Sequence, residues 1–485
     1  MTSTTGSISS AGIGSGLDVN SIVTSLMSVE KQPLTNLQTA ATTMQTKLSA
    51  FGQMQSFVST LHDTSVRLAS ASSFAVTTAT SSDTTAVGAS STAAAVTGSY
   101  SVSVTALSST QSTVSASGQF ATAADVVGTG SITISLGTWT AGQASFTAKP
   151  GTGDIVIPIG ASENTLTGIR DKINAANAGV SATIVTDASG SRLALQSSAT
   201  GASNGFRVRV ADDDGSSTDT LGLSRLAFDP PTASGTTLTQ SAANTRASIN
   251  GIAVETTDNT LTNVVDGMTF SLSKVTTSPV NVSVTHNTDA IRSVVVGFVA
   301  AYNSLASFLG SATQYDASTK KGALLQGDAT TTSLQNQLRT MIGQAGTAST
   351  AFGSLSSIGL EFQKDGTLKV NDTKLSAALS NLPQLTKAMT NVDLATPANN
   401  GFAKKFSDWS NGLLASGGSL TGKTQSIQSQ IASNQKDQDH LNTRLTAIEA
   451  RLRAQYTTLD KTMSDAKALS NYVTQQITTW NKNTA

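Results

Sequence analysis

Residues 420–480 read LTGKTQSIQSQIASNQKDQDHLNTRLTAIEARLRAQYTTLDKTMSDAKALSNYVTQQITTW. Alternating steps of four and three residues from Leu420 give one row of eighteen positions, of which twelve are apolar. No proline or glycine follows Gly422 in this stretch. A repeat that averages 3.5 residues keeps one apolar stripe facing a partner helix. The stretch therefore favours a long coiled-coil helix over a helix packed in an ordinary bundle.

Polar residues within and beside this stripe affect the register and the number of the partner helices. Asn434 and Gln438 occupy stripe positions, where a buried amide lowers stability but fixes helix register and partner number. Arg444 and Glu449 flank the stripe at a spacing suited to an ion pair between helices. The predicted stem or oligomer interface on this helix consists of Ile427, Ile431, Asn434, Leu441, Leu445, Ile448, Leu452 and Leu459.

The N-terminal part of the chain supplies a second long amphipathic helix. Asp18 is placed to cap a first helix, and Pro33 fits the first turn of a second helix that we predict to end near residue 69. Two successive apolar steps of three around Phe51 indicate a change of packing partner. Residues 1–16 are small and glycine-rich, and we expect them to be disordered. The predicted interface residues of the second helix are Leu37, Met44, Leu48 and Phe51.

Composition narrows the class of protein. The 485 residues carry 30 Lys and Arg against 30 Asp and Glu, which gives no electrostatic footprint for nucleic acid or an anionic membrane. Charged residues make up only 12%, about half the usual share of ~25%, and cysteine is absent. We expect no membrane helix and no cleavable secretion signal, since neither a long apolar run nor a basic start is present. A neutral, hydroxyl-rich surface suits a secreted or surface-assembled structural protein.

The middle of the chain changes to an apolar period of two, from about residue 74 to residue 284. Its alternating, β-branched runs are separated by Gly, Asn, Asp and Pro, which predicts antiparallel strands. One short helix is expected around Leu166, Ile169 and Ile173. The segments 163–167 and 258–262 are nearly identical, which suggests a duplicated small β-rich module.

The helical period returns after residue 288. Thr288 or Asp289 is expected to cap the first of these helices. Lys364-Asp365-Gly366 lies between two short apolar runs and predicts a hairpin, and Pro383 is expected to break a helical segment at 374–390. The apolar face that we expect to form the core of this region contains Ile291, Val295, Phe298, Tyr302 and Leu305.

No catalytic, cofactor or metal site is predicted. Residues 201–205 match G-x-S-x-G, but that elbow requires a strand before the serine and a helix after it, and here a strand follows. Three scattered histidines and no cysteine argue against a zinc site, and Asp212-Asp213-Asp214 lacks the ligand spacing of a calcium loop. We interpret Trp139, Trp409 and Trp480 as core or interface anchors.

The order of several short motifs resembles the flagellar filament-cap family, also called flagellar hook-associated protein 2. The resemblance spans both ends and most of the middle, and the segment 131–210 is similar to β-rich inserts of flagellar axial proteins. The motifs are Ile8-Ser9-Ser10, Gly14-Ser15-Gly16-Leu17-Asp18, Ala301-Tyr302-Asn303-Ser304-Leu305, Ile358-Gly359-Leu360 and Asp365-Gly366-Thr367-Leu368.

The resemblance implies a secreted protein at the distal tip of the bacterial flagellum. It implies a homo-oligomeric, pentamer-like ring that promotes flagellin folding and polymerisation and prevents leakage of flagellin monomers. Flagellin, adjoining axial proteins and the export machinery would be its partners, without nucleic acid, cofactor, membrane insertion or catalysis. A tip adhesin for mucin or a host surface and a passive axial junction protein are the alternatives.

The expected fold is an α+β multidomain chain in which long terminal coiled-coil helices form a stem. A helical and β leg domain and inserted antiparallel β-rich head domains complete it. The predicted boundaries are 1–48 for the N-terminal segment and stem helix, 49–105 and 289–418 for the leg, 106–246 for the outer head, 247–288 for the inner head, and 419–485 for the C-terminal stem helix.

Overall fold

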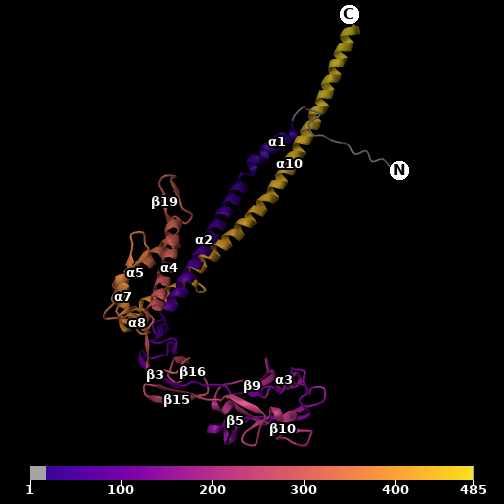
Figure 1. The fold of residues 1–485 in the computed structure, drawn as a ribbon. Helices are drawn as coiled ribbons and strands as arrows, with labels where there is room; N and C mark the ends of the chain where they lie inside the picture. The colour runs from indigo at the N-terminus through magenta and orange to yellow at the C-terminus, as the bar shows by residue number, and fades with distance from the viewer. Residues whose placement is uncertain (1–17, 484–485) are drawn as a thin grey trace. The chain divides into compact units, whose positions relative to one another are not determined.

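The structure is a computed structural model that describes residues 18–483. The predicted disorder of residues 1–16 therefore lies outside the described residues. The chain divides into a helical unit, made of the residues up to Ser73 and from Ile291 onward, and a β unit, Phe74–Ala290. The fold is α+β with several domains, and helices of the two chain ends lie side by side in the helical unit (Figure 1).

The helical unit contains two long helices, several shorter ones and two short hairpins. The N-terminal elements are α1 (Val19–Glu30), α2 (Gln32–Leu68) and the 3₁₀ turn η1 (Ala71–Ser73). The later elements are α4 (Thr288–Thr313), β19 (Tyr315–Asp316), β20 (Lys321–Gly322), α5 (Ala329–Gly343), α6 (Leu355–Ile358), β21 (Leu360–Phe362), β22 (Leu368–Val370), α7 (Asp372–Leu379), α8 (Leu382–Thr390), η5 (Pro397–Asn399), α9 (Phe402–Leu414) and α10 (Ser419–Asn483).

Local sequence signals explain most of the helix ends. The Asp18 carboxylate accepts a hydrogen bond from the Ser21 N–H at 2.9 Å, and Pro33 lies in the first turn of α2, as predicted. The hairpin around Gly366 and the break before Pro383 are also confirmed. The cap of α4 was predicted wrongly, because the side chain of Asn287, rather than Thr288 or Asp289, accepts the N–H of Ala290.

The stripe change at Phe51 coincides with a change of partner. At Gln55, α2 still contacts α10, through a hydrogen bond to the Thr424 hydroxyl. Further along, the Phe57 ring lies 5.3 Å from the ring of Phe308 in α4, and His62 lies within 3.2 Å of the Ser410 hydroxyl in α9. One half of α2 therefore packs in the stem, and the other half packs in the core of the leg.

The β unit contains eighteen strands and one α-helix within the described residues. Its first strands are β1 (Thr77–Ser81), β2 (Val87–Ser91), β3 (Gly98–Ala106), β4 (Ser112–Ser115), β5 (Gly130–Trp139), β6 (Phe146–Ala148) and β7 (Ile155–Ile159). The helix α3 (Leu166–Ala175) precedes β8 (Val180–Asp187), β9 (Gly190–Ser197), β10 (Gly205–Asp212), β11 (Phe228–Asp229), β12 (Ala233–Ser234) and β13 (Thr236–Gln240). The last strands are β14 (Thr245–Ile249), β15 (Ile252–Thr256), β16 (Thr260–Thr262), β17 (Met268–Leu272) and β18 (Val280–His286); short 3₁₀ turns are η2 (Ala141–Gln143), η3 (Ala202–Asn204) and η4 (Gly222–Leu226).

Two separate apolar cores organise the β unit. The sheets β1-β18-β3-β14-β15 and β16-β17-β2 enclose one core, which includes Val102, Phe270 and Val282. The sheets β12-β11-β10-β5-β6, with β7, and β13-β4-β9-β8 enclose the other, which includes Ile132 and Phe206 and is covered by α3. Strand pairing is antiparallel throughout the described β unit, as the alternating patterns predicted.

The structure assigns residues 77–105 differently from the predicted leg boundaries of 49–105. Strand β1 pairs with β18, and β3 pairs with both β14 and β18, so these strands belong to the β unit. Partners 140 or more residues away in the chain leave no local signature that would separate these strands from the preceding helix. The suggested duplication is also wrong at the level of structure, because Leu166 begins a helix whereas Leu261 lies in strand β16.

Helix α4 is long and apolar enough to cross a membrane by length and composition alone. The expectation that no segment reaches that composition was therefore wrong. Its apolar face is buried in the helical unit, with Ile291, Val295 and Leu305 fully enclosed. That burial accounts for the composition of α4 as a core helix.

Candidate assembly surface of the helical unit

The stem is an antiparallel pairing of α1 and α2 with α10 inside one chain (Figure 1). Near the start of α10, the Thr424 hydroxyl accepts a hydrogen bond from the Gln55 amide at 3.3 Å. Far along α10, the Arg453 guanidinium donates to the Asn20 side-chain oxygen at 3.0 Å. The helix stripes predicted for the two chain ends thus meet within the chain, with opposite directions.

The structure brings most of the predicted stem residues into this pairing. Ile427, Asn434, Leu445 and Phe51 are buried, and the Lys423 ammonium lies 5.7 Å from the centre of the Phe51 ring. Leu459 is the exception, because it is exposed and lies beyond the end of the pairing. The half-buried members of the predicted set are Leu37, Met44, Leu48, Ile431, Leu441, Ile448 and Leu452.

Helix α1 docks on α10 through a small apolar cluster. Val19, Val23 and Met27 recur at steps of four along α1, and all three are buried together with Leu445 of α10. Around them pack the half-buried side chains Leu34, Leu441, Ile448, Leu452 and Tyr456. None of these three α1 residues belongs to the interface predicted from the sequence.

The polar residues of the stripe form bonds along α10 itself. The Gln438 amide donates to the Asn434 side-chain oxygen at 2.6 Å, which partly satisfies the buried amide of Asn434. The predicted pair of Arg444 with Glu449 is wrong, because Glu449 forms its ion pair with Arg453, one turn further along, at 2.8 Å. A spacing of four on one helix face brings these two side chains together more readily than a contact across helices.

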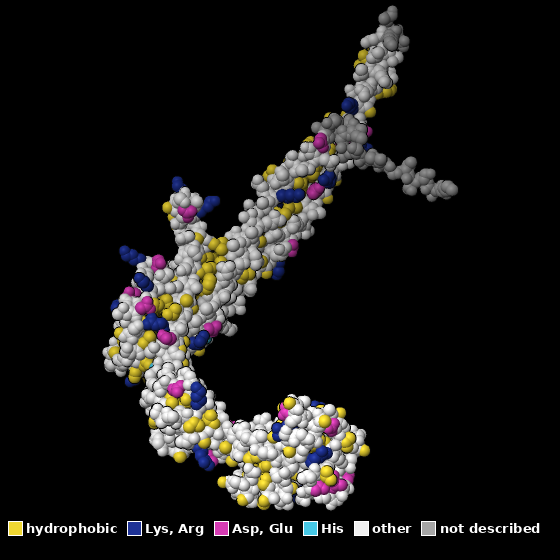
Figure 2. All heavy atoms as spheres, viewed as in Figure 1, with side chains coloured by type: hydrophobic (Ala, Val, Ile, Leu, Met, Phe, Trp, Pro, Cys, Tyr) yellow, Lys and Arg dark blue, Asp and Glu magenta, His cyan; other side chains and the backbone are white. Residues whose placement is uncertain are grey.

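Beyond Tyr456 the apolar stripe of α10 continues without cover. We call the side chains Leu459, Met463, Leu469, Val473 and Ile477 the distal stripe. Each of them is between 45% and 64% exposed, and Figure 2 shows hydrophobic side chains along this part of α10. A run of this length with its apolar side in water is typical of a surface that another helix covers.

The predicted leg core is assembled as one cluster in the helical unit. Ile291, Val295, Phe298, Tyr302 and Leu305 are all buried on α4. The Phe406 ring of α9 lies 5.1 Å from the Phe298 ring and 6.2 Å from the Tyr302 ring, in edge-on geometry. The Tyr302 hydroxyl donates to the Gly366 carbonyl at 3.2 Å, and burial raises the pKa of Tyr302 to about 12.

An ion pair ties α5 to α10. Asp328 caps α5 by accepting the Thr331 N–H at 3.0 Å, and its other carboxylate oxygen lies 2.8 Å from the Lys423 ammonium. Burial acts to raise the pKa of Asp328, but the bonds from Lys423 and Thr331 outweigh it and hold that pKa below its ordinary value. This contact was not predicted from the sequence, although an Asp before a helical run is a recognisable capping signal.

Two kinds of chemical site, a metal-binding cluster and a serine elbow, were checked against the described residues. Residues 18–483 hold no group of three His, Asp or Glu side chains placed to bind a metal ion. The G-x-S-x-G match forms a short 3₁₀ turn, Ala202–Asn204, followed directly by strand β10, so Ser203 is not on a strand-to-helix elbow.

Comparison with known proteins agrees with this arrangement. The family model described as flagellar hook-associated protein 2 C-terminus matches residues 242–468, and the N-terminus model matches residues 15–111. The flagellin hook IN motif matches residues 145–199, within the β unit. Flagellar hook-associated protein 2 of Escherichia coli strain K12 is 32% identical over 97% of this chain and 98% of its own length. The chain belongs to the flagellar hook-associated protein 2 family.

Other relatives match most or nearly all of the chain. The B-type flagellar hook-associated protein 2 of Pseudomonas aeruginosa is 31% identical over 96% of this chain and 97% of its own. The crystal structure of the flagellar cap protein D1-D2-D3 domains from Escherichia coli matches with a TM-score of 0.58 and 27% identity, over 78% of this chain and 99% of that one. This member of the family functions as the cap of the flagellar filament, at the distal, extracellular tip.

Proposed function

We propose that the chain works as a homo-oligomeric ring that retains exported flagellin at the filament end and promotes its folding and polymerisation. The ring is pentamer-like, and the export machinery and adjoining axial proteins are its further partners. The predicted head, leg and stem domains divide this work, and the predicted stem residues Leu441, Leu445 and Ile448 hold the stem together. In this proposal no step requires catalysis.

The distal stripe carries the proposal. Leu459, Leu469 and Val473 continue the repeat that starts at Leu420, and Met463 and Ile477 lie one residue beside it; all five find no cover within the described chain. An uncovered coiled-coil stripe gains order and buries apolar area when it docks on partner helices. We assign that contact to helices at the growing end of the filament.

A modest contact suits a cap that has to move each time a subunit is added. Burial of five half-exposed apolar side chains contributes on the order of 4–8 kcal/mol before any cost is subtracted, since full burial of one gives about 1.5–3 kcal/mol. Ordering costs reduce this further. The contact can therefore break and reform as flagellin folding drives the cap outward.

The test uses cells that lack the gene and produce flagellin. Three strains receive the wild type, a distal-stripe variant with Leu459, Leu469 and Val473 replaced by Asp, or a matched control. The control places Asp at Thr457, Asn471 and Gln475, which are exposed on the opposite side of α10. Flagellin in the medium is measured against flagellin in filaments.

We expect the wild type and the control to restore filaments, and the distal-stripe variant to release flagellin into the medium. Restored filaments with the distal-stripe variant would remove the stripe from the filament contact. If the deleted cells form normal filaments and lose only surface attachment, the cap function itself is refuted in favour of a tip adhesin.

A further inference from the structure

Helix α1 joins the rest of the stem through a hinge. It ends at Glu30, and α2 begins at Gln32 with a proline in its first turn. Pro33 has no N–H to donate to the carbonyl of Val29, one turn before it, so the hydrogen-bond ladder of a continuous helix is interrupted there. Helices bend at such interruptions, so α1 can change its direction while α2 stays in place.

Helix α1 is held on α10 by a small contact. Three of its apolar side chains are buried in the cluster around Leu445. Two others, Leu26 and Val29, are 42% and 65% exposed. The hydrogen bond from Arg453 to Asn20 joins exposed side chains, where water competes with it. Docking on α10 therefore satisfies only part of the apolar surface of α1, whose 12 residues are a marginal length for a helix in water.

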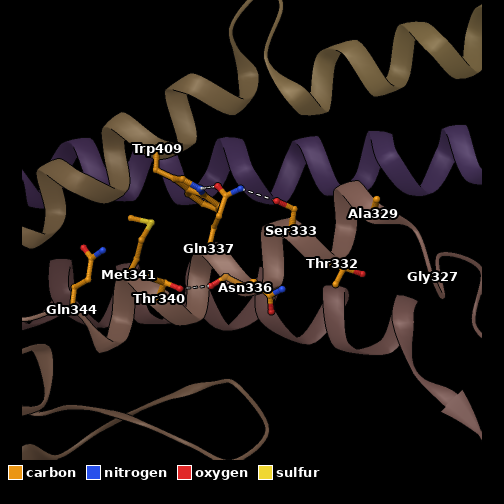
Figure 3. Close-up of a pocket in the computed structure, with 10 residues that line it drawn as sticks. All are labelled: Gly327, Ala329, Thr332, Ser333, Asn336, Gln337, Thr340, Met341, Gln344 and Trp409. Carbon is orange, nitrogen blue, oxygen red and sulfur yellow. Dashed lines mark hydrogen bonds between the residues drawn. The ribbon is translucent and has the colours of Figure 1, made fainter.

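Neighbouring elements of the helical unit are fixed more firmly. A pocket of about 760 Å³ lies along α5 beside Trp409 of α9, and Figure 3 shows Gln337 of α5 extending across to the indole. The Trp409 N–H donates to the Gln337 side-chain oxygen at 2.6 Å. The ion pair of Lys423 with Asp328, at 2.8 Å, ties α5 to α10. Helix α1 is therefore better suited to move than α5 or α9.

The part of α10 that α1 covers is the most apolar stretch of its stripe. Leu441, Leu445, Ile448 and Leu452 occupy four successive positions of the row that begins at Leu420. We call these four side chains the covered row. All four belong to, or pack against, the cluster that α1 forms with α10. No other apolar run on the row exceeds three positions, so the best docking surface of α10 lies under α1.

The covered row and the distal stripe form one continuous surface on α10. Leu459, the first residue of the distal stripe, follows Leu452 after one heptad of the same row. The beginning of α1 lies at this junction, because Asn20 contacts Arg453. A partner helix that docks on the distal stripe therefore meets the end of α1. It can extend over the covered row only if α1 leaves.

We propose that α1 is a removable cover, which a helix of the filament end displaces when it docks on α10. The occupant is an amphipathic helix whose apolar side spans the distal stripe and the covered row, because the two form one seam. In the free chain, α1 shields the most apolar part of α10 from other chains. This inference rests on the proposed filament contact and adds a step to it, the movement of α1 about Pro33.

A covalent link across the contact of α1 with α10 tests the displacement, because the chain contains no cysteine of its own. The full chain carrying Asn20→Cys and Arg453→Cys is treated with a short bismaleimide, and the product linked within one chain is isolated by size. The same chain treated with N-ethylmaleimide carries equivalent groups without the link. Each protein is added to cells that lack the gene and release flagellin, and flagellin in filaments is measured.

We expect the unlinked chain to restore filaments as the wild type does, and the linked chain to restore at least tenfold fewer. The control link joins Gln55→Cys to Thr424→Cys, whose native side chains are hydrogen-bonded at 3.3 Å between α2 and α10. This control should restore filaments fully, since α1 remains free to leave. Full restoration by the chain with α1 linked, or equal loss with both links, would overturn the inference.

Photo-cross-linking identifies what covers the row after docking. Tyr456, which packs against the same cluster, is replaced by p-benzoylphenylalanine, an aromatic side chain of similar shape. On irradiation, the free chain should form a link to its own α1, whereas the chain on filaments should form a link to a filament protein. A link to its own α1 on filaments, or to α1 of a second copy, would contradict displacement by a filament helix.

The outcomes separate this inference from the filament contact. If the distal-stripe variant fails to restore filaments but the chain with α1 linked succeeds, the filament contact stands and the removable cover is refuted. If the distal-stripe variant restores filaments, the filament contact is refuted, and displacement of α1 by a filament helix is refuted with it.

Discussion

Replacing Leu445 by Ala should release α1 from α10 without unfolding the rest of the helical unit. Leu445 is only 4% exposed and is the one fully buried α10 side chain in the cluster that holds Val19, Val23 and Met27. Alanine is a better helix former than leucine, so α10 itself loses nothing in intrinsic helix stability. The effect of the substitution therefore lies in the lost packing.

The structure sets the size of this effect. Leucine-to-alanine changes in buried sites cost about 2–5 kcal/mol, and the half-buried surroundings here place the cost near the lower part, at about 3 kcal/mol. Helix α1 has 12 residues, a length at which an isolated helix is marginal in water. Because 1.4 kcal/mol is a factor of ten, the undocked population of α1 should rise by roughly 100-fold.

Amide hydrogen exchange measures this opening. The amides of α1 should exchange roughly 100-fold faster in Leu445→Ala, while those of α4, enclosed in the leg core, should keep their rates. Leu469→Ala, at a position 64% exposed, is the matched control and should leave α1 within about 0.5 kcal/mol of the wild type. Unchanged exchange in α1, or equal acceleration in α1 and α4, would refute the reasoning.

Three further predictions concern charge and polarity. Asp328→Asn should lower the free energy of unfolding at pH 7 by about 1 kcal/mol, because the ion pair with Lys423 is lost. Since the pKa of Asp328 is lowered in the folded state, this advantage of the wild type should disappear as pH falls below about 4. Equal differences between the two proteins at pH 7 and pH 3 in denaturant titrations would contradict this. In an absorbance titration of the five tyrosines, Tyr302 should ionise only near pH 12, and Tyr302→Phe should remove that late step. The neutral Tyr302 should stabilise the folded state fully below about pH 10, and this contribution is lost as pH rises above that value. A titration complete by pH 11 would be inconsistent with burial of Tyr302. Asn434→Leu should raise the free energy of unfolding by about 1 kcal/mol, because it replaces a buried amide in the stripe with an apolar side chain. A lower midpoint of thermal unfolding would show that Asn434 makes a more stabilising contact than its hydrogen bond with Gln438.

Patterns confined to a few neighbouring residues were predictable. The cap at Asp18, the first-turn proline at Pro33, the hairpin at Gly366 and the break before Pro383 all follow from bonds or steric limits within one turn. The position at which α2 changes partner was also visible, because a shift in apolar phase rotates the stripe.

Pairings between distant residues were not predictable from these patterns. The assignment of β1 and β3 to the β unit depends on β18, which lies more than 170 residues later in the chain. The pairing of Glu449 with Arg453, by contrast, is a local contact at a spacing of four on one helix, which the coiled-coil interpretation overlooked.

The sequence by itself determined that both ends of the chain form long amphipathic helices, because a 3.5-residue repeat carries its own geometry. Only the tertiary structure decided what covers each part of those stripes. It paired α1 and α2 with α10 in the antiparallel direction and left the distal stripe exposed. A stripe specifies that a partner is needed, whereas the identity of the partner depends on the lengths of the two helices and on where the chain between them turns back.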